Sequence, residues 1–269
     1  LNLNWVLFDS GLRRANTEMA RQMLAAANAA HDAALQSVLF ETAQFYYLAQ
    51  TRRASLDASL AAEKSAHDSQ VVTEARYVAG AGSLADKLQA ETALAQSRLD
   101  RVRAEGELKN ALGTLAVQVG LPAESPIALD VPDASLPGVE FATSLQSLMD
   151  EARQQHPSLL AARAELDAAI ARVDAAKAEG RPSISLIGST TRADSRGQLP
   201  ADSINHDHSI GLQLNIPIFE GFGRSYRIRQ ATSEVEGKSA ELENQIRKTR
   251  LDVWKAYQAL QTEGGNLQA

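Results

Sequence analysis

The amino-acid sequence predicts a mainly α-helical protein with a small β part, built from long antiparallel helical hairpins. Two observations lead to the helical part of this prediction. All eight prolines lie between Pro122 and Pro217, so long stretches on either side carry no helix breaker. In those stretches alanine, leucine, glutamine, glutamate and arginine predominate, and these residues favour helix. A third observation, short segments that alternate polar and apolar side chains, predicts the strands.

Composition excludes several classes of protein. The chain has 269 residues and no cysteine, which rules out a disulfide scaffold, a thiolate metal site and a cysteine nucleophile. With 27 basic against 33 acidic residues and a net charge of -6, the chain does not have the balance of a nucleic-acid-binding protein. No apolar run reaches the length of a transmembrane helix. The abundance of alanine and the 5% of aromatic residues are typical of closely packed helices rather than of a ligand pocket.

The first long hairpin is predicted over residues 14–120. Helix-forming residues run from Arg14 to about Ala79, which at 1.5 Å per residue gives a helix of roughly 100 Å. Helix resumes at Leu84 and continues to about Val119. Apolar residues on both arms recur mostly at steps of 3, 4 or 7, which approximates the seam of an antiparallel coiled coil. Small alanines flank this seam, so we expect the hairpin to pack against further helices.

The turn between the two arms is the first candidate site. Its glycines supply the backbone freedom of a helix end, and a serine followed by an aspartate is suited to cap the next helix. Helix termination and capping explain this pattern, and a docking surface is compatible with it. The candidate residues of this tip, residues 80–83 and their neighbours, are Arg76, Tyr77, Gly80, Ala81, Gly82, Ser83, Leu84 and Asp86.

In the middle of the chain, the sequence predicts that the long hairpin gives way to an irregular segment and then to further helices. Residues 121–144 carry four prolines and read as an irregular connector. Helices are predicted over 145–180, in which Pro157 suits the first position of a helix. A last helix begins after Gly223 and is predicted to end at the glycine pair 264–265.

Three segments are predicted to be strands because they alternate polar and apolar residues: 1–5, 183–186 and 209–218. The polar stretch 193–207 between the second and third is predicted to be a surface loop, with His206-Asp207-His208 at its end. Histidine and aspartate are able to bind a metal ion, but in a polar loop we expect these three to be solvated. Residues of the third strand that would form one apolar face are Ile210, Leu212, Leu214, Ile216 and Ile218.

The chain repeats itself at an offset of 211 residues. Phe8-Asp9 matches Phe219-Glu220, Tyr46 matches Tyr257, and Gln50 matches Gln261. Each copy passes from a strand through a phenylalanine, an acidic residue and a glycine into a long helix, so we infer a duplication. The phenylalanines are expected to anchor the junction between strand and helix. The candidate junction residues are Phe8, Gly11, Phe219, Gly221 and Gly223.

Taken together, three segments resemble the TolC-like outer membrane efflux proteins, or outer membrane factors. Residues 7–11 and 216–221 resemble the paired strand-to-helix motif of that family. Residues 80–91 look like its hairpin tip, and residues 156–186 are similar to the helix-to-strand segment that opens its second repeat. The resemblance covers essentially the whole chain, and the order and spacing of the motifs make it specific.

The resemblance implies a homotrimer whose long hairpins form an α-barrel, while each subunit contributes strands to one shared twelve-stranded transmembrane β-barrel. Residues 1–13 and 181–222 would supply strands and an extracellular loop, and residues 14–120 a periplasmic hairpin. Residues 121–144 would be an equatorial connector, and residues 223–269 the start of a second long helix whose own tip lies outside this chain. An open sheet edge cannot face lipid, so strands in a membrane must be shared. The residues alone leave a soluble half-buried sheet as an alternative.

The function that the resemblance implies is an exit duct in the outer membrane of a Gram-negative bacterium, serving a tripartite efflux or type I secretion system. Its partners would be a periplasmic adaptor (membrane fusion) protein that docks on the tip, an inner-membrane pump, and outer membrane lipid on the apolar strand face. The sequence contains no phosphate-binding loop and no hydrolase motif, so we expect no catalysis, no cofactor and no resident metal. The alternative function is that of a soluble periplasmic coiled-coil adaptor or scaffold.

Overall fold

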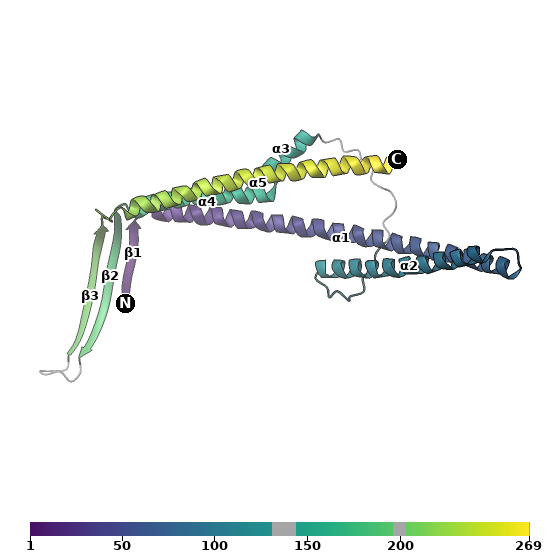
Figure 1. Cartoon of the computed structure of the whole chain (residues 1–269). Coiled ribbons are helices and arrows are strands. Elements are labelled where there is room, and N and C mark those ends of the chain that lie inside the picture. The colour runs from purple at the N-terminus through teal and green to yellow at the C-terminus, as the bar shows by residue number, and fades with distance from the viewer. Residues whose placement is uncertain (131–143, 196–202, 269) are drawn as a thin grey trace. The chain divides into compact units, whose positions relative to one another are not determined.

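The computed structural model describes residues 1–130, 144–195 and 203–268 and confirms a mainly helical fold with a small sheet (Figure 1). Its elements follow the predicted order, although the bounds of several of them differ. In chain order they are β1 (Asn2–Phe8), α1 (Leu12–Val78), α2 (Leu84–Gln118), α3 (Leu145–Gln155), α4 (Pro157–Glu179), β2 (Ser183–Ser195), β3 (Ser203–Asn215) and α5 (Gly223–Gln268).

The chain divides into two compact units. One comprises Leu1–Ala33 with Val139–Ala269, and the other comprises Ala34–Gly138, so α1 contributes to both. Among the described residues, no helix combines the length and the apolar character that crossing a membrane requires.

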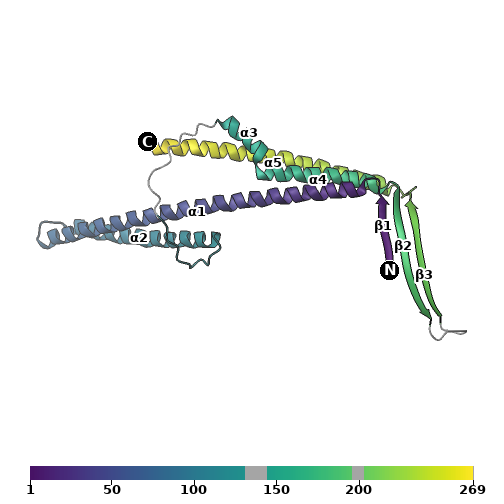
Figure 2. The same cartoon turned by 180° about the vertical axis from the view of Figure 1, so that it is seen from behind.

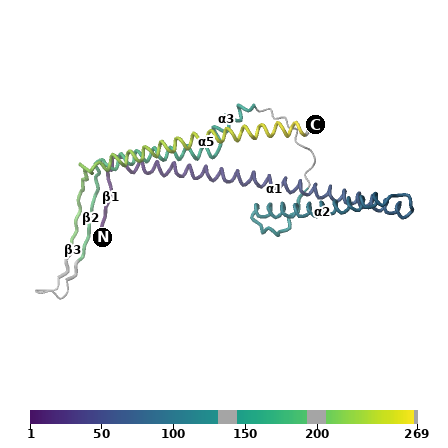
Figure 3. The backbone as a smooth tube through the Cα atoms, viewed as in Figure 1, coloured from purple at the N-terminus to yellow at the C-terminus, as the bar shows by residue number. Residues whose placement is uncertain are grey.

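The unit Ala34–Gly138 is an antiparallel hairpin of α1 and α2 (Figure 3). Its core is small and rich in alanine, which lets the two helices approach closely. Ala49 is fully buried. Residues 121–130 form neither helix nor strand, and residues 131–143 of the predicted connector lie outside the described part. The buried core residues are Ala49, Ala111, Leu115 and Leu129, with Phe45, Tyr46, Leu112 and Ile127 packed against them.

In the other unit, α4 packs along α5 (Figure 2). The buried side chains of α4 are almost all alanines, several of them spaced by three or four residues on one face. Ion pairs at the edge join the two helices, with Arg172 2.9 Å from Glu234 and Lys238 2.9 Å from Glu165. The buried residues of α4 are Pro157, Leu159, Ala164, Ala168, Ala169, Ala171, Ala175, Ala176 and Ala178.

The sheet has the order β1-β2-β3, and both pairs are antiparallel. Trp5 pairs with Leu186, and Leu186 pairs with Leu212. The register of β1 against β2 shifts between Val6 and Phe8, just before α1. This irregularity lies where the chain turns from strand to helix, as bulges often do when pairing ends.

The prediction of a loop over 193–207 is wrong at both ends. β2 continues to Ser195 and β3 begins at Ser203, so only residues 196–202 lie between the strands, and these are outside the described part. The pairing of strands is made by main-chain groups, and polar side chains do not prevent it. Cross-strand bonds accompany the pairing, with Ser189 Oγ 2.9 Å from Ser209 Oγ.

Two other predicted bounds are also wrong. β3 ends at Asn215 rather than at 218, so Ile216 and Ile218 follow the strand instead of completing it. Pro217 has no N–H and cannot donate to a sheet, which explains the earlier end. α5 continues through Gly264 to Gln268, because a glycine inside a helix lowers its stability without ending it.

Candidate functional site: the hairpin tip and the strand-to-helix junctions

The tip, residues 80–83 and their neighbours, begins with a defined helix end. The Gly80 N–H donates to the Tyr77 carbonyl at 3.0 Å, and the Ala81 N–H donates to the Arg76 carbonyl at 2.8 Å. This pair of bonds is the Schellman motif, which requires a left-handed residue after the last turn. Gly80 takes that position with φ of 72°. The candidate residues at the end of α1 therefore fix the direction in which the chain leaves the helix.

Glycine suits position 82 for a different reason, the close approach of the chain. A side chain at this position would place its Cβ 3.2 Å from both the Arg76 Cβ and the Tyr77 nitrogen. The turn thus folds back against the end of α1 too closely for any other residue without a shift. Of the two tip glycines that the sequence singled out, Gly80 provides the left-handed backbone conformation. Gly82 provides room for the close approach of the chain to the end of α1.

Ser83 and Asp86 start α2 with a reciprocal capping box. The Asp86 N–H donates to Ser83 Oγ at 3.1 Å, and the Ser83 N–H donates to Asp86 Oδ2 at 3.3 Å. The Ser83 hydroxyl also donates to Asp86 Oδ2 at 2.7 Å. These hydrogen bonds from Ser83, side chain first, lower the pKa of the Asp86 carboxyl. Both ends of the turn are therefore held by specific bonds.

A lysine that the sequence analysis did not select joins the two arms behind the turn. Lys87 Nζ donates to Glu74 Oε1 at 2.8 Å and lies 5.2 Å from the centre of the Tyr77 ring. The hydrogen bond to Glu74 raises the pKa of Lys87. The sequence signal that could have revealed this contact is the pair of opposite charges, Glu74 and Lys87, on either side of the predicted turn. The contact holds Tyr77, a candidate residue, against the second arm.

Apolar side chains remain exposed around this rigid turn. Val78 is 76% exposed and Leu84 is 52% exposed, and Leu88 one turn further along α2 is exposed as well. Exposed apolar side chains on a well-ordered surface are characteristic of protein contact sites. The hairpin therefore ends in an ordered turn with exposed apolar side chains beside it.

The two strand-to-helix junctions share one backbone conformation. Ser10 and Gly11 have φ of 53° and 94°, and Gly221 and Phe222 have φ of 57° and 66°. These pairs correspond at the offset of 211, so the duplication preserves two consecutive left-handed residues. Gly223 does not adopt positive φ and simply begins α5. The second left-handed residue of this copy is Phe222, which the sequence analysis missed because a phenylalanine gives no signal for it.

Phe8 and Phe219 were expected to anchor these junctions, but both are exposed, Phe219 to 76%. Polar contacts hold the first junction instead. Asp9 accepts hydrogen bonds from the main-chain N–H groups of Gly11 and Arg13, at 3.2 and 3.0 Å, and pairs with the Arg13 side chain at 2.9 Å. At the second junction Glu220 pairs with Arg227. The Phe219 ring packs edge to face on the Phe222 ring, with centres 5.7 Å apart.

One face of the sheet carries exposed apolar side chains. Ile210, Leu212 and Leu214 alternate along β3, and the first two are 80% and 71% exposed. The register places Trp5 on the same face through Leu186. Ile216 and Ile218, the other two candidates for this face, are exposed beyond the end of the strand.

His206, Asp207 and His208 lie on β3 rather than in a loop. His208 Nδ1 lies 3.1 Å from the Thr190 hydroxyl oxygen, and Arg192 faces His206 in the register. Within the described ranges, no group of three or more histidine, aspartate or glutamate side chains is placed to hold a metal ion.

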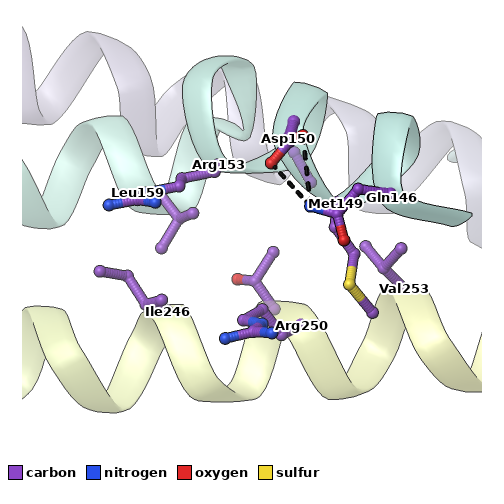
Figure 4. Close-up of a pocket in the computed structure, with 10 residues that line it drawn as sticks. Gln146, Met149, Asp150, Arg153, Leu159, Ile246, Arg250 and Val253 are labelled. Carbon is purple, nitrogen blue, oxygen red and sulfur yellow. Dashed lines mark hydrogen bonds between the residues drawn. The ribbon is translucent and has the colours of Figure 1, made fainter.

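A pocket of about 270 Å³ lies between α3, α4 and α5 (Figure 4). Met149, Leu159 and Ile246 line it, and the buried Thr249 hydroxyl beside it has no hydrogen-bond partner within the described residues. The Gln146 amide is bonded to Asp150 at the rim. Nothing in this lining pairs a nucleophile with a base, so we assign the pocket to helix packing.

The sequence matches the family model described as "Outer membrane efflux protein" over residues 1–121 and 148–269. It is 36% identical to protein CyaE of Bordetella pertussis over 96% of this chain and 54% of that protein. It is 26% identical to the proteases secretion protein PrtF of Dickeya chrysanthemi over 78% of this chain and 45% of that protein. The chain thus spans about half the length of these relatives.

The fold is also similar to that of a solved structure, the outer membrane protein VceC from Vibrio cholerae. The TM-score is 0.78 at 22% identity, over 97% of this chain and 62% of that protein. At this level of identity the likeness is evidence for the fold of the chain alone.

Proposed function

The chain belongs to the outer membrane efflux protein family, and from that premise we propose that it is part of an outer membrane exit duct. The duct would conduct substrates passively from a periplasmic adaptor and an inner-membrane pump to the exterior of the cell. The name of the relative PrtF, a proteases secretion protein, favours type I secretion within this class. The single observation that carries the proposal is the pairing of an exposed apolar sheet face with a long helical hairpin in one chain.

The sheet supports a position in the membrane. Its exposed apolar face, with Ile210, Leu212 and Leu214, suits contact with outer membrane lipid. The opposite face carries polar residues such as Gln213 and Asn215. Three strands cannot close on themselves, and a sheet with open edges cannot face lipid. We therefore propose that three copies of the protein share one closed sheet.

The tip supports the contact with the adaptor. Its Schellman motif and capping box hold a short turn rigidly at the end of the hairpin, and Val78 and Leu84 are exposed beside it. A rigid surface loses little conformational entropy when a partner docks on it. In this proposal the pump supplies the energy, and the duct itself hydrolyses nothing and needs no cofactor.

The first test is the molar mass of the full-length gene product by light scattering, with and without detergent. A trimer that needs detergent to remain soluble supports the duct. A monomer or dimer that is indifferent to detergent would overturn it and favour the soluble coiled-coil adaptor or scaffold.

A matched pair of variants sharpens this test. Leu212→Arg places a charge on the apolar face, where lipid exposure costs about 2–4 kcal/mol near the middle of the membrane. Gln213→Arg places the same charge on the opposite face of the same strand. We expect Leu212→Arg to reduce the amount of trimer in the outer membrane and Gln213→Arg to leave it unchanged. Equal amounts for the two variants would contradict the assigned faces.

A further inference from the structure

The apolar face of the sheet ends in a group of basic side chains. Alternate residues of a strand share one face, so His208 and His206 continue the alternation of the exposed apolar residues beyond Ile210. On the neighbouring strand β2, Arg192 pairs with His206 and Thr190 pairs with His208. The three basic side chains are exposed. We call Arg192, His206 and His208 the basic band.

The members of the basic band are close enough to bind one anion together. Paired residues on neighbouring strands have their Cβ atoms about 5 Å apart. Residues two positions apart on one strand are separated by about 7 Å. Arg192 and His206 form such a pair, and His208 is two positions from His206. Arginine and histidine side chains are long enough to bridge these spacings, so their nitrogen atoms can meet on one phosphate group.

The band supplies hydrogen-bond donors on one face of the sheet. The Arg192 guanidinium has a fixed positive charge and a planar set of N–H groups that matches the oxygen atoms of a phosphate. His208 Nδ1 lies 3.1 Å from the Thr190 hydroxyl oxygen. When that hydroxyl donates to Nδ1, the neutral ring carries its proton on Nε2 and offers it to a ligand. Asp207, between the two histidines, pairs with Thr191 and belongs to the opposite face.

The position of the basic band suits the headgroup level of a membrane. At about 3.3 Å per residue, the eight steps from Ile210 to Ile218 extend over roughly 26 Å. The apolar band of a membrane-spanning sheet is about 25 Å tall. The basic band begins two residues beyond Ile210. Because β2 begins after α4 and β3 ends before α5, the band lies toward the far end of these strands (Figure 1). With the helices in the periplasm, that end belongs to the outer leaflet.

We propose that the basic band binds the phosphate group of an anionic lipid of the outer leaflet, whose acyl chains lie along Ile210 and Leu212. This inference rests on the proposed function, which places the apolar face in lipid. A phosphate monoester carries nearly two negative charges at neutral pH and three acceptor oxygens, which suits one guanidinium and two imidazole donors. The occupant is a lipid because the apolar surface continues directly from the basic band. A free phosphate ion has no apolar part and gains nothing from that surface.

The test uses the full-length gene product as a trimer in detergent, and native mass spectrometry counts the lipid molecules that stay bound. The probes are diphosphorylated lipid A, the same lipid without its phosphate groups, and inorganic phosphate. We expect lipid A to bind about tenfold more tightly than its dephosphorylated form, the effect of losing hydrogen bonds to a charged group. Inorganic phosphate at the same concentration should not displace lipid A. If it does, the site binds a small anion and the lipid proposal is wrong.

Arg192→Gln should weaken the binding of lipid A about tenfold, and His206→Gln and His208→Gln about threefold each. The matched control is Arg247→Gln, which removes the same charge from an exposed position of α5 and should leave the affinity unchanged. Equal affinities for the Arg192→Gln and Arg247→Gln variants would overturn the proposal.

The duct and the lipid site fail in different ways. A gene product that is not a detergent-dependent trimer contradicts the duct, and this proposal with it, before any lipid is added. A detergent-dependent trimer that binds lipid A no more tightly than the dephosphorylated lipid contradicts the lipid site alone.

Discussion

Gln261 donates a hydrogen bond of 3.0 Å to the Tyr257 hydroxyl, and Gln50 donates one of 3.1 Å to the Tyr46 hydroxyl. The internal repeat of the sequence is thus reproduced in the structure down to one pair of side chains. The backbone at the two junctions repeats as well, with two consecutive left-handed residues in each copy. Similar bonds in the two copies show that the duplication kept local geometry even where most residue identities changed.

The hydrogen bonds that Tyr46 and Gln50 donate to the Asp130 carbonyl oxygen contribute to the stability of the hairpin. Tyr46→Phe removes the hydroxyl that donates to the Asp130 carbonyl, while the ring can keep its packing. We expect the free energy of unfolding to fall by about 1 kcal/mol, the usual value for such a bond. Urea denaturation of the chain measures it. The control is Tyr47→Phe, since Tyr47 is 64% exposed and should give no change. Equal losses in the two variants would contradict a stabilising role for the Tyr46 hydroxyl.

Gly11 is required for its conformation rather than for space. Nothing lies within 4 Å of the position where a Cβ would stand, but φ is 94°. Gly11→Ala should therefore lower the free energy of unfolding by about 1 kcal/mol, from the cost of a left-handed residue. Gly106→Ala is the control, because Gly106 lies inside α2 with equally open space. That variant should raise the free energy of unfolding by about 0.5–1 kcal/mol. Changes of the same sign would refute this interpretation.

The tip is expected to be essential for export and dispensable for assembly. Gly80→Pro is incompatible with φ of 72° and removes the N–H that donates to Tyr77, so it distorts the turn. Ser83→Glu replaces the serine of the capping box with a charged side chain. We expect both variants to remain folded trimers that do not support export, measured as secreted substrate in a strain without the native gene. Ser83→Ala is the control, with a loss of about 1 kcal/mol of helix stability and export retained. Normal export by Gly80→Pro and Ser83→Glu would rule out docking at the tip.

The capping box should make stability depend on pH. Because hydrogen bonds from Ser83 lower the pKa of Asp86 below its ordinary value of 3.8, folding favours the ionised carboxyl. Its contribution is complete above pH 3.8 and is lost as the pH falls through the lowered pKa. The measurement is the difference in unfolding free energy between the unchanged protein and Asp86→Asn from neutral to strongly acid pH. We expect this difference to vanish in acid, and to be much reduced at every pH in a Ser83→Ala background. A difference that persists unchanged in acid would disprove the assignment.

The buried alanines of α4 set how closely its neighbours approach. Ala164→Leu adds three carbons where the side chain is buried, so we expect a loss of about 1–3 kcal/mol in the free energy of unfolding. Ala240→Leu makes the same change at an exposed position of α5 and should stay within about 0.5 kcal/mol. Chemical denaturation of the two variants side by side measures both effects. If both variants lose equal stability, close packing at α4 is not the cause.

The helices were the most predictable part of the protein. Ser83 and Pro157 mark the starts of α2 and α4, and the glycines of the tip mark the end of α1. Such signals act through hydrogen bonds within one turn of helix, so they are visible in a short stretch of sequence. The end of α5 was misjudged because glycines weaken a helix without stopping it.

The sheet and the junctions were less predictable. The length of β2 and β3 depends on main-chain pairing between residues far apart in sequence, and the polar residues of the hairpin gave no sign of it. The left-handed conformation of Phe222 and the contact of Lys87 with Glu74 also depend on neighbours that only the folded chain supplies.

Local sequence was enough to predict the helical hairpin, the internal duplication, the positions of the turns and the resemblance to a family of outer membrane proteins. These follow from residue types that act locally or from the order of motifs along the chain. The folded chain was needed to show which alanines are buried, how far the strands pair, and that Tyr46 and Gln50 hold a carbonyl while Tyr257 and Gln261 repeat their geometry. Burial, strand pairing and side-chain hydrogen bonds between distant residues depend on where their partners lie in space, which a short stretch of sequence does not contain.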